Sequence, residues 1–269
     1  MTKFPFRLGT TSYIVPADIL PNLSYLAGKV QDVELILFEV DDGPNNLPSP
    51  AQVSEMKAIA LEHGLTYTVH LPLDLRLADD GSLQHASLQK ARRVIECTCS
   101  LEPWAYVLHL DGRAVRHQPA TSAYQRWLEQ ANISLQQVGQ WAGGLERLAV
   151  ENLEGYPADF YEPVFEQVSV SRCVDIGHLW LDGQDPLTYL RRALPRTRVV
   201  HIHGLAERDH RSLRYVLPES LRAVLDVLRQ SEYHGVLTVE VFSEEDFLSS
   251  LEALQQAAEW TSLDKEGCR

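Results

Sequence analysis

Carboxylates and imidazoles stand at the ends of short apolar runs along this chain. In the segment CVDIGHLWLDG, which begins at Cys173, an apolar run ends in Asp175, and His178 follows three residues later. Seven of eight such runs end in side chains that could bind a metal ion: Glu39, His70, His109, Glu151, Asp175 with His178, His201 with His203, and Glu240. Nitrogen and oxygen ligands without thiolates suit zinc, manganese, cobalt or iron. The pattern predicts a metal site, provided that the fold brings these side chains together.

The apolar runs alternate with segments in which apolar residues have helical spacing. The runs predict strands at residues 6–12, 33–39, 65–70, 104–110, 147–152, 172–177, 198–204 and 236–242. Residues 50–63, with Pro50 at their start and Gly64 just beyond, and residues 218–234 are typical of the helices between them. Eight strands, each followed by a helix, predict an α/β fold, a (β/α)8 TIM barrel that forms a single domain over residues 1–269. A doubly wound sheet is the alternative, but LGTTSY after the first strand lacks a glycine-rich phosphate turn.

A parallel barrel would gather the strand-end side chains in one pocket, because all its strands end on the same face. A dry cluster of carboxylates repels itself unless cations or protons are present, and divalent ions supply that charge. Glu39 is the weakest candidate, since it could instead orient a neighbour or cap the following loop. His203 shares a strand face with His201 and could bind metal or donate to a phosphate. The loops at residues 40–49 and 71–82 are candidate walls or lids of the pocket.

A second carboxylate–imidazole pair follows the seventh strand. Asp209 and His210 lie in a short loop that could fold back over the pocket, with an ordinary solvated loop as the alternative. Guanidinium groups fit phosphate oxygens in bidentate fashion, so several loop arginines are candidate substrate contacts. These are Arg113, Arg116, Arg208 and Arg211.

The remaining histidines are predicted to be structural. His63, His85, His117 and His234 fall in predicted helices or helix-to-strand turns, mostly on the opposite side of the barrel. His63 and His234 each precede a glycine, which predicts a position at a helix C-terminus, where the helix dipole favours an imidazole.

Composition limits the partners and the compartment. The formal net charge is −13, and no basic run offsets it, so duplex nucleic acid is a poor partner. No apolar stretch reaches the roughly 18 residues of a membrane span, and the first residues lack a signal-peptide pattern, so no membrane partner and a cytoplasmic location are expected. The four cysteines, Cys97, Cys99, Cys173 and Cys268, suit a reducing compartment and predict neither a disulfide framework nor a cysteine zinc site. The sequence does not define an oligomeric state.

The strand-end pattern resembles that of the xylose-isomerase-like barrel superfamily. The matching residues are Glu151, Asp175-x-x-His178, His201 and Glu240, on the fifth to eighth predicted strands, and the resemblance extends over nearly the whole chain. Sugar epimerases of this superfamily use such a quartet around one metal, with the two glutamates exchanging protons with the substrate. The endonuclease IV type of phosphodiesterase adds ligands and holds three zinc ions.

His70, His109, Asp209 and His210 fill those additional places, so the resemblance favours the phosphodiesterase branch with two or three divalent ions. The family loop reads Asp-x-His, whereas Asp209 and His210 are adjacent, so a third ion would be held differently or be absent. On this interpretation Glu151 and Glu240 bridge metals, Asp175 and His178 share another ion, and His70, His109 and His201 complete the shells. Glu151, Glu240 and His203 would be the catalytic residues.

Two longer segments carry a closer resemblance. Residues 7–50 and residues 65–77, LTYTVHLPLDLRL, are similar to bacterial cobamide-remodelling phosphodiesterases of this superfamily. The resemblance implies a small-molecule substrate, a cobamide such as coenzyme B12, cleaved in its nucleotide loop to cobinamide phosphate and the α-riboside of the lower ligand. Tyr13 and Trp180, just past strand ends, could pack on a flat corrin or base. The alternatives are a metal-dependent sugar or sugar phosphate isomerase or epimerase, and a metal-binding protein without turnover.

Overall fold

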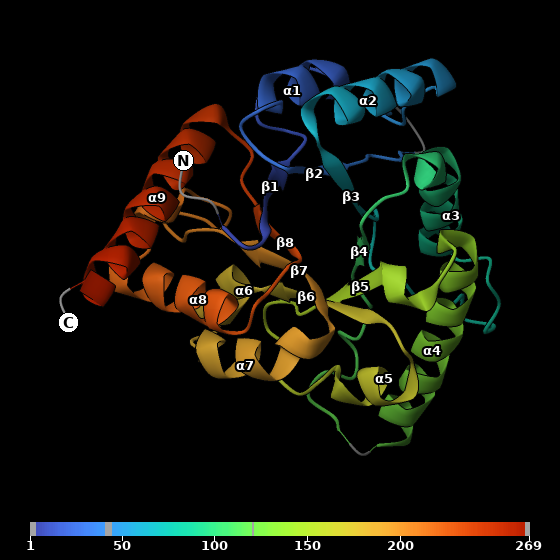
Figure 1. The fold of residues 1–269 in the computed structure, drawn as a ribbon. Coiled ribbons are helices and arrows are strands. Elements are labelled where there is room, and N and C mark those ends of the chain that lie inside the picture. Colours follow the sequence, from blue (N-terminus) through green and yellow to red (C-terminus); the bar gives the residue numbers. More distant parts are fainter. Residues whose placement is uncertain (1–3, 41–44, 120, 267–269) are drawn as a thin grey trace.

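Eight parallel strands close into a barrel in the order β1 to β8, surrounded by helices (Figure 1). The computed structural model describes residues 4–40, 45–119 and 121–266. The strands are β1 Arg7–Thr11, β2 Asp32–Ile36, β3 Thr66–His70, β4 Tyr106–Leu108, β5 Leu148–Glu151, β6 Ser171–Asp175, β7 Thr197–Ile202 and β8 Val236–Val239. Each overlaps one predicted strand, so the predicted (β/α)8 TIM barrel is confirmed.

The helices cover the outside of the barrel. They are α1 Ile19–Leu26, α2 Pro50–His63, α3 Ala86–Thr98, α4 Ser122–Ala142, α5 Glu162–Gln167, α6 Ile176–Leu181, α7 Pro186–Ala193, α8 Pro218–Gln230 and α9 Glu244–Glu266. Short 3-10 turns lie at Cys99–Leu101, Leu145–Arg147, Leu194–Arg196 and Leu213–Tyr215. Within the described residues, no helix combines the length and apolar character needed to cross a membrane.

The helix from Pro50 to His63 shows how local sequence sets these boundaries. The Ser49 hydroxyl accepts a hydrogen bond from the Gln52 backbone N–H, and the Gln52 side chain accepts one from Ser49 N–H, which closes a capping box. Pro50 supplies a fixed φ at the first helical position, and Gly64 ends the helix with a left-handed φ of 65°. The predicted bounds of α2 are therefore confirmed.

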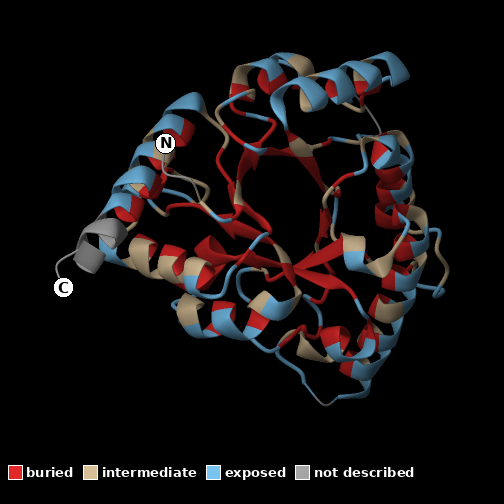
Figure 2. Ribbon diagram, in the orientation of Figure 1, coloured by how far each residue is buried: buried red, intermediate tan, exposed pale blue. Residues whose placement is uncertain are grey.

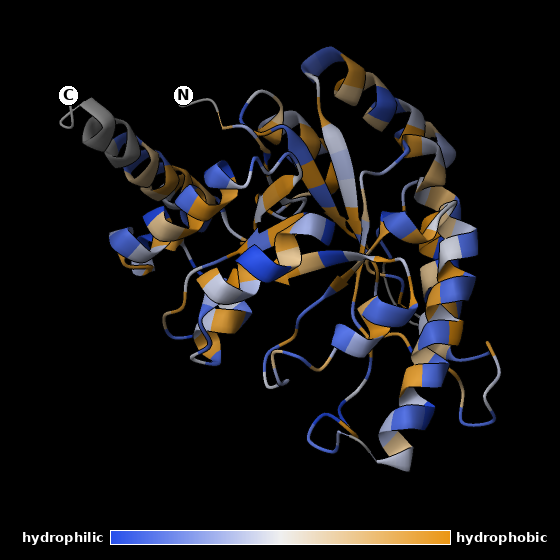
Figure 3. Cartoon of the chain, turned by 60° about the horizontal axis from the view of Figure 1, so that its bottom comes forward, coloured by the Kyte–Doolittle hydropathy of each residue, from blue (hydrophilic) through white to orange (hydrophobic). Residues whose placement is uncertain are grey.

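The core is largely apolar, with buried polar side chains such as Asp32, Glu34 and Thr68 on the strands. Figure 2 shows buried residues along the strands and on the inner sides of the helices, while the outer helix faces are exposed. Figure 3 shows the corresponding alternation of hydrophilic and hydrophobic residues around the helices. This packing fixes the strands rigidly, so side chains at their carboxyl ends are held in defined positions.

Two sequence predictions about structural histidines are wrong. The helix predicted to reach residue 234 ends at Gln230, and the His234 Nδ1 instead lies 3.2 Å from the Pro5 carbonyl oxygen. His85 is the N-cap of α3, and His117 lies in the segment between β4 and α4, so both follow carboxyl ends of strands rather than lying on the opposite side. His63 is the last residue of α2, as predicted.

Asp32, at the amino end of β2, should make stability depend on pH. Its side chain is fully buried, and burial raises the pKa of its carboxyl to about 7. The unfolded-state pKa of an Asp carboxyl is about 3.9, so the protonated Asp32 contributes fully to the free energy of unfolding only below that pH. This contribution, on the order of 4 kcal/mol, is lost as pH rises through 7. Asp32→Asn should therefore be increasingly more stable than the parent protein between about pH 5 and 8.

Urea unfolding at several pH values measures this difference. The Asn side chain can still accept the hydrogen bond that the Thr66 hydroxyl donates to Asp32, so the comparison isolates the charge. Asp159→Asn, at an exposed position, is the matched control and should leave the pH profile of the parent protein unchanged. A constant stability difference between Asp32→Asn and the parent over this pH range would contradict the prediction.

Candidate metal centre

Nitrogen and oxygen donors meet at the carboxyl ends of six strands and in the loop after β7. We call this set the donor cluster; it consists of His70, His109, Glu151, Asp175, His178, His201, His203, His210 and Glu240. Within it, several groups of three or four residues place one donor atom each within 4.8 Å of one another. Eight of these nine residues are sequence-predicted ligands, and His203 was predicted to be a catalytic residue that could also bind metal.

One group of four donors, all of them buried, contains Glu151, Asp175, His201 and Glu240. The His201 Nδ1 lies 3.1 Å from a Glu240 oxygen, 3.6 Å from a Glu151 oxygen and 3.9 Å from an Asp175 oxygen. Three of these atoms, Asp175 Oδ2, His201 Nδ1 and Glu240 Oε2, are buried without a hydrogen-bond partner among the described residues. Unpaired buried polar atoms are costly, and both carboxylate oxygens lie within 3.9 Å of the His201 Nδ1, so a cation among the three atoms would offset this cost.

Glu151 also belongs to a second group. Its Oε2 lies 3.5 Å from the His70 Nε2 and 3.2 Å from the His109 Nε2, whereas its Oε1 faces His201. The two carboxylate oxygens thus point toward two different sets of nitrogen donors. This arrangement suits a carboxylate that bridges two metal ions.

A third group joins three imidazoles, those of His178, His203 and His210. The His203 and His210 rings stack with centroids 4.3 Å apart, and the buried His203 Nε2 lacks a hydrogen-bond partner among the described residues. His210 has a φ of 51°, a left-handed conformation that is strained for this residue and typical of functional sites. Asp209 lies outside the group: its Oδ1 is 3.3 Å from the His210 Nδ1, and its side chain is 41% exposed. The structure thus places His203, rather than Asp209, with the other two donors.

Gly177 explains the glycine in the DIGH segment. A Cβ atom at this position would lie 2.2 Å from the His203 Nε2. A glycine at the second position of α6 therefore leaves room for the His203 ring beside the start of the helix, which directly follows Asp175.

Three residues that sequence reasoning missed hold the donors in place. The Glu34 Oε2 lies 2.8 Å from the His201 Nε2, and the Asp74 Oδ1 lies 3.1 Å from the His109 Nδ1. The Asn152 side chain bonds both the backbone N–H and the carbonyl of Asp175. Such contacts fix which imidazole nitrogen faces a metal. A carboxylate inside the apolar run VELILFE is the signal that could have identified Glu34.

The prediction for Glu39 is wrong. Its carboxylate pairs with Arg93 at 2.6 Å and with Lys90 at 3.1 Å, and Arg93 lowers the pKa of the Glu39 carboxyl. Glu39 lies three residues beyond the end of β2 at Ile36, where strand alternation no longer directs side chains inward.

The candidate phosphate-binding arginines have different surroundings. Arg113 is 70% exposed and pairs with Asp74, which connects it to His109. The Arg116 guanidinium lies 5.5 Å from the Tyr156 ring centroid, and Arg208 is exposed. Arg211 pairs with Glu207 at 3.0 Å and with Asp246 at 3.3 Å. Carboxylates therefore already engage Arg113 and Arg211.

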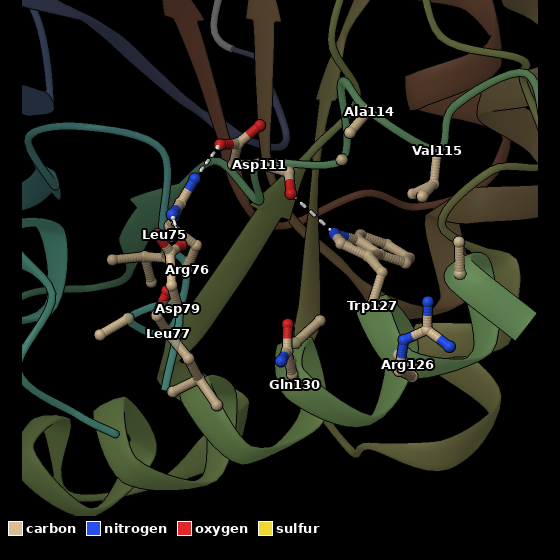
Figure 4. A pocket seen from close by; sticks show the side chains of 14 residues that line it. Leu75, Arg76, Leu77, Asp79, Asp111, Ala114, Val115, Arg126, Trp127 and Gln130 are labelled. Atoms are coloured by element: carbon tan, nitrogen blue, oxygen red, sulfur yellow. Dashed lines mark hydrogen bonds and ion pairs between the residues drawn. The ribbon is translucent and has the colours of Figure 1, made fainter. Parts of the chain in front are cut away.

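A pocket of about 310 Å³ lies beside the segments that follow β3 and β4, outside the donor cluster (Figure 4). The Trp127 indole of α4 donates a hydrogen bond to the Asp111 carbonyl at 2.7 Å, and the Arg76 guanidinium lies 3.9 Å from the Asp111 carboxylate (Figure 4). These contacts hold Asp111 in place. Because Asp111 lies two residues after His109, they also help to fix the position of His109, a candidate metal ligand.

A family model identifies the family of this chain. A model of the family described as xylose isomerase-like TIM barrel matches residues 29–262. The chain belongs to this family. No curated protein matches the chain in sequence.

Solved structures with the same fold include different enzymes. This xylose isomerase-like barrel is similar to a D-tagatose 3-epimerase-like protein, with TM-score 0.75, 17% identity and coverage of 96% of this chain and 99% of the other. It is also similar to 3-keto-D-glucoside 4-epimerase from E. coli, with TM-score 0.67, 19% identity and coverage of 94% and 99%. Endonuclease IV from Thermus thermophilus matches with TM-score 0.65, 19% identity and coverage of 94% and 99%. At these identities the similarity establishes the fold.

The carboxylates of the donor cluster in this xylose isomerase-like barrel favour positive charge on the neighbouring imidazoles. Burial by itself lowers the pKa of His109, but Glu151 and Asp74 outweigh it and raise this pKa to about 10. Burial likewise opposes the charged form of His210, yet Glu240 raises its pKa to about 9. Divalent ions compete with protons for such imidazole nitrogens, so metal binding should release protons.

Cys173 adds a thiol that the sequence argument did not anticipate here. It is buried on β6, and its sulfur forms a further group with donor atoms of Glu151 and His201. Burial raises the pKa of this thiol well above its usual value, which favours the neutral form over the thiolate that metals prefer.

Replacing Glu34 by Gln should weaken metal binding about 10- to 100-fold, because the amide no longer orients His201 as the carboxylate does. Competition with a fluorescent chelator measures the affinity. Glu39→Gln is the control, because Glu39 follows the same strand but pairs with Lys90 and Arg93. The metal affinity of the Glu39→Gln variant should match that of the parent protein. Equal affinities of Glu34→Gln and Glu39→Gln would show that Glu34 does not position a ligand.

Proposed function

We propose that this protein is a metal-dependent phosphodiester hydrolase. The observation that carries the proposal is the size of the donor cluster, in which His70, His109, His178, His203 and His210 supplement the buried quartet. One ion of zinc, manganese, cobalt or iron cannot use all of these donors, whereas two or three ions can. Multinuclear sites with bridging carboxylates are typical of phosphoester hydrolysis.

The chain's own residues define how such a site would work. Glu151 presents one oxygen to His70 and His109 and the other to His201, so it would hold two ions side by side. Glu34 and Asp74 keep the ligand imidazoles in fixed orientations. Bound divalent ions would neutralise phosphate oxygens and promote ionisation of the attacking water.

The net charge of the chain and a sequence resemblance favour a small anionic diester as the substrate. A chain with net charge −13 repels long polyphosphate backbones, so we infer a small-molecule substrate and no nucleic acid partner. The resemblance of residues 7–50 and 65–77 to cobamide-remodelling phosphodiesterases supports a cobamide as that substrate. Hydrolysis would break the bond between phosphorus and the ribose oxygen. The oxygen of water would end on cobinamide phosphate, and the α-riboside would leave with a proton.

Sugar epimerisation is the second candidate. The quartet of Glu151, Asp175, His201 and Glu240 is sufficient for one metal, and both glutamates lie within 3.6 Å of the His201 Nδ1. Two carboxylates could then exchange protons with a sugar. Two of the similar solved structures described above carry epimerase names.

Incubation of metal-loaded protein with adenosylcobalamin in ¹⁸O-water tests the proposal. Mass spectrometry should find one ¹⁸O atom in cobinamide phosphate and none in the α-riboside, and a chelator should stop the reaction. Absence of both products from metal-replete protein would overturn the cobamide proposal. Incorporation of deuterium from solvent into a ketose, without cleavage of the cobamide, would establish epimerisation instead.

A further inference from the structure

Two exposed aromatic side chains follow the first two strands of the barrel. Tyr13 follows β1 and Phe38 follows β2, and their side chains are 44% and 43% exposed. Their rings meet edge to face, with centroids 5.5 Å apart and planes at 82°. Large aromatic groups gain stability by burial, so an exposed pair beside a candidate catalytic site indicates a contact surface for a ligand.

Strand register places both rings at the mouth of the barrel. Thr10 pairs with Val239, so Tyr13 lies two residues beyond the level of Glu240. Ile36 pairs with His70, so Phe38 lies two residues beyond the level of His70. Tyr13 and Phe38 therefore follow the carboxyl ends of β1 and β2, on the face of the barrel that carries the donor cluster. A substrate bound over this face could contact both rings.

A cavity of about 350 Å³ adjoins the two rings. Leu47 and the amides of Asn45 and Asn46 complete its wall, and Asp18 is its only carboxylate among the described lining residues. The Asn46 amide accepts a hydrogen bond from the Phe38 N–H and donates one to the Ile36 carbonyl at 2.9 Å, which fixes Phe38 relative to β2. The cavity is thus built on anchored backbone rather than on a free loop.

We propose that this cavity binds the planar, uncharged heteroaromatic base of the substrate's riboside; this inference rests on the proposed function. Aromatic faces and neutral amides recognise flat rings by stacking and hydrogen bonding. A cavity of about 350 Å³ has room for a bicyclic base. On this proposal the base occupies the side of the mouth formed by β1 and β2, while the phosphate lies over the donor cluster.

Calorimetric titration of chelator-treated protein with 5,6-dimethylbenzimidazole riboside tests the inference without turnover. Stacking on an aromatic ring predicts that Phe38→Ala and Tyr13→Ala each raise the Kd for the riboside about tenfold, whereas Tyr13→Phe keeps the ring and binds like the parent. D-ribose, which lacks the base, should bind equally weakly to all variants. Leu61→Ala, at an 88% exposed apolar position on α2, is the control and should not change the Kd.

Thermal melts establish that each variant is folded, as expected because both aromatic side chains are substantially exposed. A riboside Kd that is the same in Phe38→Ala, Tyr13→Ala and the parent would overturn the aromatic site, whether or not cobamide is cleaved. Failure of the parent protein to hydrolyse cobamide would overturn the proposed function. The riboside Kd values of the variants would still decide whether the aromatic site exists. In active protein, Phe38→Ala should raise KM for adenosylcobalamin about tenfold, whereas Leu61→Ala should leave it unchanged.

Discussion

Replacing Glu151 by Gln should lower cobamide hydrolysis by about 10³-fold or more, since a bridging carboxylate in a multinuclear site contributes several kcal/mol to transition-state stabilisation. Gln has the same shape but presents an uncharged amide to His70, His109 and His201, each of which lies within 3.6 Å of a Glu151 oxygen. The variant should also retain fewer equivalents of metal. Product formation and elemental analysis measure the two effects.

Glu166→Gln removes the same charge from an exposed position on α5 and is the matched control. It should hydrolyse cobamide and retain metal as the parent protein does. If Glu151→Gln kept the metal content and turnover of this control, Glu151 would not bridge metal ions, and the multinuclear interpretation would fail.

His109→Ala separates the hydrolase from the epimerase. The quartet on β5 to β8 could support proton transfer around one metal without His109, whereas the group of His70, His109 and Glu151 requires it. We expect the variant to lose about one equivalent of metal and at least about 100-fold in α-riboside release, because the second ion loses one of three protein donors.

His117→Ala, an exposed histidine in the same segment between β4 and α4, should change neither quantity. Full hydrolysis by His109→Ala with unchanged metal would remove His109 from the site. Metal loss together with intact exchange of a sugar proton would instead assign the quartet to an epimerase.

The alternation of strands and helices could be predicted from local sequence because it depends on nearest neighbours in the chain. Apolar runs of strand length, and signals such as Ser49, Pro50 and Gly64, act within a few residues. The predicted ends of β5, β6 and β7, at residues 152, 177 and 204, lie one or two residues beyond the observed ends at Glu151, Asp175 and Ile202.

The sequence by itself predicted that potential metal ligands stand at or within one residue of the carboxyl ends of β3 to β8, and that only a closed barrel could gather them. Tertiary structure decided which neighbouring residues complete the site. Glu34 faces His201 from inside the barrel, whereas Glu39 lies past the strand end and pairs with Lys90 and Arg93. His203 forms a group with His178 and His210 and stacks on the His210 ring, whereas Asp209 contacts His210 from outside this group. These outcomes depend on loop conformation and on contacts between residues far apart in the chain, which no local pattern encodes.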